Sequence, residues 1–158
     1  MHNYDAYGLS KEVDERTAEM FCRRNQMSIA ALRFHWICTP EEQLQRIQAQ
    51  RGQRNWAAEL RLLWGYVDVR DAARACRLGI EAARKQPYGF QPMNIVAGDA
   101  LAEEPVAELL AEHAPDIDVR AELSPEAGAF AIARAEKIIG WRPQHSWRAT
   151  EPTAGGET

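Results

Sequence analysis

The N-terminal part of the chain has the periodicity of an amphipathic helix. Apolar residues recur at helical spacing between about Tyr7 and Asn25, and polar residues fill the positions between them. This spacing predicts one helix with an apolar stripe turned toward the core. The stripe consists of Leu9, Val13, Met20 and Phe21.

The next segment, from Ser28 to Cys38, is almost continuously apolar and contains β-branched and aromatic residues. Such a run is typical of a strand buried within a parallel sheet. Further patterns predict strands at 64–69, 93–97 and 117–121, and helices after Pro40, at 72–85, near Pro105 and at 131–139. Because strands alternate with helices, the pattern indicates an α/β fold.

Local signals indicate where some of these helices begin and end. Thr39 and Glu42 have the spacing of a capping box, with Pro40 at the first helical position between them. Asp71 is a candidate N-cap for the helix at 72–85. Gly140 is a typical residue at a helix C-terminus.

Composition excludes several classes of protein. The 158 residues suit one domain, placed at 1–148, followed by a polar tail at 149–158 that we expect to be disordered. The net charge of -4 argues against a nucleic-acid or membrane-surface binder, both of which need a basic face. No apolar run is long enough to cross a bilayer, and the first residues lack a secretory signal, so we expect a cytoplasmic protein.

Cysteine and histidine do not suggest a disulfide framework or a metal site. The three cysteines are widely spaced and are expected to be small buried side chains. The four histidines are scattered and lack metal-ligand spacing.

The strongest chemical signal is Tyr7 with Lys11, one helical turn later. An ammonium group beside a phenol favours the phenolate, so the pair could act as a general acid and base on a hydroxyl or carbonyl oxygen. The alternative is an exposed Tyr that packs on a Lys stem. Helical geometry places the pair about 200–240° away from Leu9 and Val13, on the face opposite the predicted core stripe.

Five segments in order resemble the extended short-chain dehydrogenase/reductase family, the NAD-dependent epimerases and dehydratases. The first, Asp5-Ala-Tyr-Gly-Leu-Ser-Lys11, looks like the Tyr-x-x-x-Lys helix start of that family. The others are Leu32-Arg33 running on to Pro40, the junction at 64–73, Asn94-Ile95-Val96, and the closing helix with Gly-Trp-x-Pro at 133–143.

The resemblance implies an α/β fold corresponding to the C-terminal half of a Rossmann-type enzyme, without the N-terminal dinucleotide-binding strands. It also implies an NAD or NADP cofactor and a sugar, sugar acid or sugar nucleotide as substrate. In that family Tyr7 would match the catalytic acid/base, and Lys11 would match the residue that lowers the pKa of the Tyr and holds the nicotinamide ribose. The backbone at Phe34 and His35 would touch the nicotinamide end.

The chain also departs from the family pattern. Trp36 and Thr39 replace the usual Asn and Gly after the strand, and no G-x-x-G-x-x-G occurs among the ten glycines. We therefore expect a fragment that is inactive alone and that pairs with a separately encoded N-terminal half or forms a homodimer. The alternative is a non-catalytic remnant or interaction module that lost cofactor binding. In either case we expect the strand at 28–38 to keep one unpaired edge, which would leave the isolated chain marginally stable.

Overall fold

The computed structural model describes residues 5–52, 54–120 and 122–150. The elements are α1 (Ala6–Asn25), β1 (Ile29–Phe34), β2 (Ile37–Cys38), α2 (Pro40–Gly52), α3 (Trp56–Leu62), β3 (Val67–Asp68), α4 (Val69–Lys85), β4 (Phe90–Ile95), α5 (Val106–His113), α6 (Ala133–Ile139) and α7 (Trp147–Thr150). The fold is mixed α/β, as the alternating pattern predicts.

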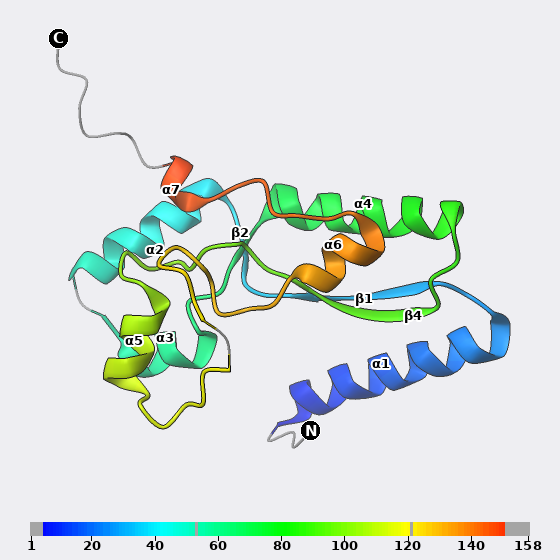
Figure 1. Ribbon diagram of the computed structural model, residues 1–158, viewed down its shortest axis with the longest axis horizontal. Coiled ribbons are helices and arrows are strands. Elements are labelled where there is room, and N and C mark those ends of the chain that lie inside the picture. The colour runs from blue at the N-terminus through cyan, green and yellow to red at the C-terminus, as the bar shows by residue number, and fades with distance from the viewer. Residues whose placement is uncertain (1–4, 53, 121, 151–158) are drawn as a thin grey trace, which may run out of the picture.

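Two small parallel sheets organise the fold. β1 pairs with β4 from Ile29 opposite Phe90 to Phe34 opposite Ile95, and β2 pairs with β3. Helix α1 lies on one face of the β1–β4 sheet, and α4 and α6 lie on the other (Figure 1). Helices α2, α3, α5 and α7 form a second lobe around β2 and β3 (Figure 1).

The predicted strand at 28–38 is interrupted. Residues His35 and Trp36 separate β1 from β2, and the two strands belong to different sheets. The predicted parallel pairing is confirmed, but the predicted burial is wrong, because no residue of β1 is fully buried and Ile37 of β2 is exposed. Within the described residues β1 has β4 as its only strand partner. An open edge leaves backbone N–H and C=O groups without sheet partners.

The apolar core consists of three clusters. The largest cluster packs on one side of the β1–β4 sheet, between that sheet and the helices α4 and α6, and two smaller clusters fill the second lobe. The main cluster contains Val67, Ala72, Ala75, Met93, Ile95, Ala135, Ile139 and Trp141. On the other side of the sheet, Cys22 is the one buried residue of α1, so this helix is held by much less apolar contact.

Helix α1 has the predicted extent, but the prediction of its buried face is wrong. Leu9 and Val13 are 54% and 53% exposed, and Met20 and Phe21 are exposed too. The face near the sheet instead carries Tyr7, Lys11, Glu15, Ala18 and Cys22, which fall within about 80° of one another around the helix axis.

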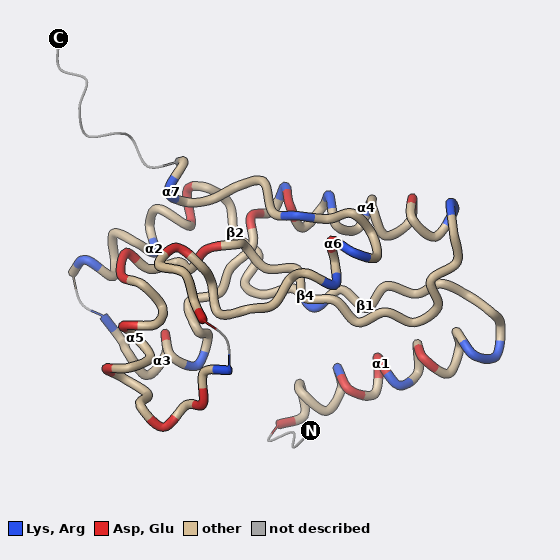
Figure 2. Tube along the Cα trace, in the orientation of Figure 1, with Lys and Arg blue, Asp and Glu red and all other residues tan. Residues whose placement is uncertain are grey.

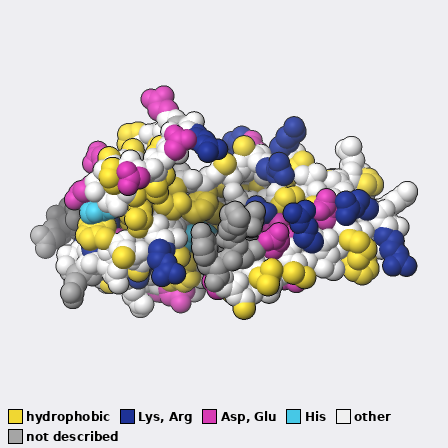
Figure 3. Space-filling model, turned by 90° about the horizontal axis from the view of Figure 1, so that it is seen from below, with side chains coloured by type: hydrophobic (Ala, Val, Ile, Leu, Met, Phe, Trp, Pro, Cys, Tyr) yellow, Lys and Arg dark blue, Asp and Glu magenta, His cyan; other side chains and the backbone are white. Residues whose placement is uncertain are grey.

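Acidic and basic residues alternate along α1 (Figure 2). Arg16 contributes to this pattern through ion pairs with Glu12 and Glu19. Seen from below, the side of the molecule that includes α1 shows hydrophobic side chains interspersed with these charged ones (Figure 3). The apolar stripe read from the sequence is therefore a mixed, solvent-facing surface.

The capping box of α2 is confirmed. The Thr39 N–H donates to Glu42 Oε2 at 2.8 Å, and the Glu42 N–H donates to Thr39 Oγ1 at 3.3 Å. These reciprocal bonds satisfy donors that a helix start leaves unpaired. Gly140 ends α6 as predicted, with φ of +67°, a conformation that favours glycine.

The start of α4 differs from the prediction, because the N-cap is Asp68 and not Asp71. Asp68 lies at the end of β3, and its Oδ1 accepts a bond from the Arg70 N–H at 2.9 Å. On α4 itself Ala72, Ala75 and Gly79 are buried as predicted, whereas Cys76 and Ile80 are exposed. The expectation of a buried cysteine thus fails for Cys76.

Asp71 has a different role: it fastens the C-terminal segment to α4. Its buried Oδ2 accepts hydrogen bonds from the N–H groups of Gln144 and His145 at 2.8 and 2.9 Å. Its Oδ1 accepts one from Arg74 at 3.0 Å, and its backbone carbonyl accepts one from Trp141 Nε1 at 3.0 Å. The carboxylate therefore lies where α4 and the segment after α6 meet.

Three further predictions concern the second half of the chain. Residues 117–120 contain no strand, so the predicted strand at 117–121 is wrong over the described residues. Helix α5 is confirmed, with Val106, Leu109 and Leu110 buried. Of the predicted tail at 149–158, the first two residues belong to α7 and residues 151–158 lie outside the described ones.

Replacing Asp71 with Ala should destabilise the protein by about 3 kcal/mol. The change removes a buried acceptor and leaves two backbone N–H groups without their partner, while Arg74 keeps only its bond to the Arg142 carbonyl. Urea unfolding at pH 7 measures the loss. Asp118→Ala is the matched control, because Asp118 is 79% exposed and should cost under about 0.5 kcal/mol. Equal losses in both variants would contradict this role of Asp71.

Asp68 should make stability depend on pH in the acid range. Burial alone would raise the pKa of Asp68, but hydrogen bonds from Arg70 and Gln43 outweigh it and lower the pKa to about 2. Because the folded pKa lies below the ordinary value, the stabilisation is present above about pH 4 and is lost as the pH falls toward about 2.

Asp68→Asn tests this dependence, since Asn can still cap a helix. At pH 7 the variant should be about 2 kcal/mol less stable than the wild type. Urea unfolding at a series of pH values should show this difference shrinking as the pH falls below about 4. A difference that stays constant down to about pH 3 would show that the charge of Asp68 does not matter.

Candidate functional site

A groove between α1 and β1 brings together the residue pair that the sequence singled out. Its volume is about 570 Å³, and Tyr7, Lys11, Glu15 and Phe34 are among the residues that line it. Helix α1 leads into β1 through a short turn, so the start of the helix lies near the carboxyl end of the strand (Figure 1). Ligands of open α/β sheets bind at the carboxyl ends of the strands.

Tyr7 and Lys11 are close to each other and open to solvent. The Lys11 ammonium lies 5.5 Å from the centre of the Tyr7 ring, and the Tyr7 side chain is 73% exposed. Asp5 fixes the start of the helix by accepting a bond from the Gly8 N–H at 2.6 Å. The phenol can therefore reach a reacting oxygen, but the ammonium also has a partner in Asp14 at 3.5 Å.

A charged clip between Glu15 and Arg33 closes the floor of the groove. Arg33 Nε and Nη2 donate to the two carboxylate oxygens of Glu15 at 2.7 and 2.6 Å. The hydrogen bond from Arg33 is the main reason that the pKa of Glu15 is lowered, and the same bond raises the pKa of Arg33. This bidentate pair joins α1 to β1 within the groove.

Phe34 and His35, the other two predicted site residues, have different surroundings. Phe34 ends β1, lines the groove and packs against the main core cluster. The His35 ring lies 5.1 Å from the Phe130 ring, and its Nδ1 accepts a bond from the Trp36 N–H at 2.8 Å. Burial lowers the pKa of His35.

Gly65 allows this arrangement of His35. A Cβ atom at position 65 would lie only 2.7 Å from the rings of both His35 and Phe130. The imidazole is therefore packed against the backbone of the second lobe and is not among the residues that line the Tyr7 groove. The predicted contact of the 34–35 backbone with a cofactor stays a prediction.

A second pocket, which the sequence did not reveal, lies in the other lobe between α2, α3 and residues 64–65. Its volume is about 540 Å³. The lining includes Trp36, Arg46, Gln50, Glu59 and Trp64. One signal was present in the sequence: Gln43, Ile47 and Gln50 share a face of α2, and all three are buried. Two glutamines on the inward stripe of a helix mark a polar interior.

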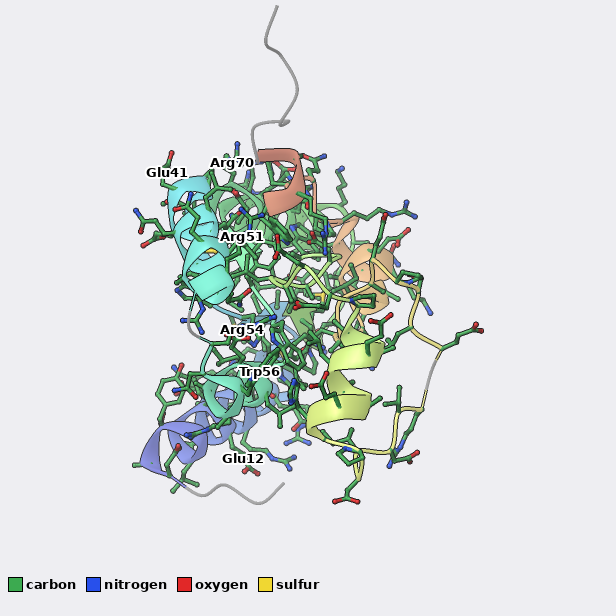
Figure 4. All side chains as sticks on the ribbon, turned by 90° about the vertical axis from the view of Figure 1, so that its left-hand side faces the viewer. Glu12, Glu41, Arg51, Arg54, Trp56 and Arg70 are labelled. Carbon is green, nitrogen blue, oxygen red and sulfur yellow. The ribbon has the colours of Figure 1, made fainter. Side chains whose placement is uncertain are left out.

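Glu59 is the buried charge of this second pocket. Its side chain is 4% exposed, and its Oε2 accepts bonds from Trp64 Nε1 at 3.0 Å and Arg54 Nε at 3.3 Å. Arg54 also pairs with Glu104 at 2.5 Å and lies 4.1 Å above the Trp56 ring. Figure 4 shows Arg54 and Trp56 together at the edge of α3. These contacts neutralise Glu59 within the pocket wall.

The described residues contain no group of three or more His, Cys, Asp or Glu side chains that could hold a metal ion. None of the helices in the described part of the chain is both long and apolar enough to span a bilayer.

Comparison with solved structures finds a similar fold. No family model matches the sequence, and no curated protein matches it either. Among solved structures, a UDP-galactose 4-epimerase superposes with a TM-score of 0.52 and 19% sequence identity, over 91% of this chain and 50% of that chain. This chain thus has an epimerase-like α/β fold and spans about half the length of that structure.

Proposed function

We propose that this chain is the C-terminal, Tyr-x-x-x-Lys-bearing part of an NAD(P)-dependent oxidoreductase or epimerase. Its substrate would be a sugar, sugar acid or sugar nucleotide. The observation that carries the proposal is the position of Tyr7 and Lys11 in one groove at the carboxyl end of β1. The epimerase-like fold supports it, as do the five sequence segments that resemble the family.

Tyr7 would act as the general acid and base. As phenolate it takes the proton from a substrate hydroxyl, and as phenol it returns a proton to a carbonyl oxygen. Lys11 lies one helical turn away, with its ammonium 5.5 Å from the centre of the Tyr7 ring. Phe34 forms part of the groove wall near the carboxyl end of β1.

The residues present fit one end of a nicotinamide cofactor. Lys11 and Tyr7 offer hydrogen-bond donors in an open groove, which suits the hydroxyls of a ribose. No G-x-x-G-x-x-G occurs in the chain, so the pyrophosphate would need residues from outside it. When bound, the nicotinamide would supply hydride transfer at the carbon whose hydroxyl faces Tyr7.

The open edge of β1 is where the other half of such an enzyme would add its strands. Among the described residues β1 has only β4 beside it, so its other edge presents backbone groups without sheet partners. An added parallel strand would pair these free backbone groups. The added strand would come from a separately encoded N-terminal half. If no such half exists, the same edge supports the alternative of an interaction module that lost cofactor binding.

Replacing Tyr7 with Phe in the completed enzyme should lower turnover by about 10²–10⁴-fold, because the proton-transfer group is lost. The sequence upstream of the Met1 codon is first read in three forward frames, and any glycine-rich half found there is expressed together with this chain. NAD(P)H absorbance with UDP-galactose or a sugar acid, or epimer ratios by NMR, then report turnover.

The matched control for this substitution is Tyr88→Phe. The Tyr88 hydroxyl donates to the Gly79 carbonyl at 3.0 Å, so its loss should cost about 1 kcal/mol of stability and leave turnover unchanged. Unaltered turnover in Tyr7→Phe would remove Tyr7 from the mechanism. A genome without an upstream glycine-rich half would favour the non-catalytic alternative.

The 158-residue chain alone should not bind NAD at micromolar concentrations. Its residues reach only the ribose end of the cofactor, and most of the affinity for a dinucleotide comes from the pyrophosphate site. Isothermal titration with NAD and NADP measures this. Micromolar binding by the isolated chain would show that the cofactor site is built differently from the one proposed.

A further inference from the structure

A third cavity lies where the end of α4, the start of β4 and the end of α6 meet. Its volume is about 540 Å³, which is within the range of small-molecule sites. We propose that it binds a small organic carboxylate with an apolar body. Lys85 and Lys137 would hold the carboxylate. Leu78 and Ile138 would contact the apolar body.

This cavity is separate from the Tyr7 groove. Tyr88 and Gln91, which line it, lie just before β4 and in its first residues, whereas Tyr7 lies near the carboxyl end of β1. Because β1 and β4 are parallel, the two cavities are at opposite ends of the sheet. They are also on opposite faces, since α4 and α6 cover the face of the sheet away from α1 (Figure 1). A ligand here would therefore not meet the proposed catalytic pair.

Two of the three lysines of the chain line this cavity, and they come from different helices. Lys85 ends α4, and Lys137 lies in the last turn of α6. Figure 2 shows basic positions at the end of α4 and on α6. Neither lysine has an ion-pair or hydrogen-bond partner among the described residues. An ammonium on a flexible stem is a point charge that can approach a carboxylate from either side of the cavity.

Glu81 is the acidic residue in the cavity lining, and it is already engaged. Its carboxylate pairs with Arg77, one helical turn earlier, at 2.7 Å. Two arginines close by in sequence, Arg84 and Arg134, add positive charge to the same two helices and have no partner among the described residues. The charge that a ligand meets at this cavity is therefore positive.

The ends of the two helices limit how large that positive charge is. Gln86, the C-cap of α4, and Gly140, the C-cap of α6, both line the cavity. A helix C-terminus carries at most about half a negative charge, so the two ends together offset about one of the two lysine charges. About one positive charge is left in the cavity, which favours a singly charged carboxylate over a doubly charged phosphate.

The apolar part of the lining extends the main core cluster to the surface. Leu78, Ala82 and Ile138 are partly buried and pack against that cluster, and Ile139 belongs to it. A ligand body on these side chains would take apolar surface out of water. Each methylene that is fully buried raises affinity about fourfold. The lysines and this apolar lining together suit a ligand with one negative charge and a hydrocarbon part.

NMR titration of the amide signals of the full chain tests the proposal with three small probes. Hexanoate carries both the charge and the apolar body, acetate lacks the body, and 1-hexanol lacks the charge. We expect hexanoate to bind at least about tenfold more tightly than either of the other two. Hexyl phosphate, which is doubly charged at about pH 8, should bind no more tightly than hexanoate.

Lys85→Met and Lys137→Met each remove one charge and keep an unbranched side chain. Each should weaken hexanoate binding about fivefold, and the double variant should bind hexanoate no more tightly than 1-hexanol. The matched control is Arg84→Met, because Arg84 is exposed beside Lys85 but does not line the cavity, and this variant should bind like the wild type. Circular dichroism checks that every variant is folded.

Four results would overturn the inference. Hexanoate may bind no more tightly than acetate or 1-hexanol, or less tightly than hexyl phosphate. Arg84→Met may weaken binding as much as the two lysine variants do. The amide shifts that hexanoate causes may lie outside residues 78–91 and 137–140. None of these results bears on the catalytic proposal, because the cavity shares no lining residue with the Tyr7 groove.

Discussion

The parallel pairing of β1 with β4 is the constraint on which the rest of the structure depends. It aligns the carboxyl ends of both strands, and the long connection between them must cross over one face, where α4 packs. The chain enters β1 from α1, which lies along the other face (Figure 1). Because α1 and β1 run in opposite directions, the first turn of the helix, with Tyr7, comes to the carboxyl end of the strand.

The same pairing explains why the two faces of the sheet differ so strongly. The face toward α4 and α6 is closed by a continuous apolar cluster that includes Met93, Ile95 and Trp141. The face toward α1 is held by small side chains and by the Glu15–Arg33 clip. Helix α1 is thus joined to the sheet partly through an ion pair, and β1 keeps one edge without a strand partner among the described residues. The superposition on the epimerase structure covers half of that structure.

The break between β1 and β2 gives the molecule its two cavities. Residues 35 and 36 leave the first sheet, and β2 joins the second sheet beside β3. The bend places Phe34 in one groove and Trp36 in the other. Packing of His35 on Phe130 and against Gly65 holds the bend in place. The Tyr7 groove and the second pocket are thus neighbours along the chain although they belong to different lobes.

The sequence by itself determined the features that rest on short-range bonds. The capping box at Thr39 and Glu42, the glycine stop at Gly140 and the one-turn spacing of Tyr7 and Lys11 all follow from residues a few positions apart. Only the tertiary structure decided which face of α1 meets the sheet. The sequence pattern marks Leu9 and Val13 as core residues, but both are exposed, and Glu15 on a different face of the helix pairs with Arg33 of β1. It also decided that Asp71 holds residues 144 and 145, and that Gln50 is buried with an unpaired oxygen. Burial and long-range hydrogen bonds depend on segments far apart in the chain, and no local pattern records where those segments meet.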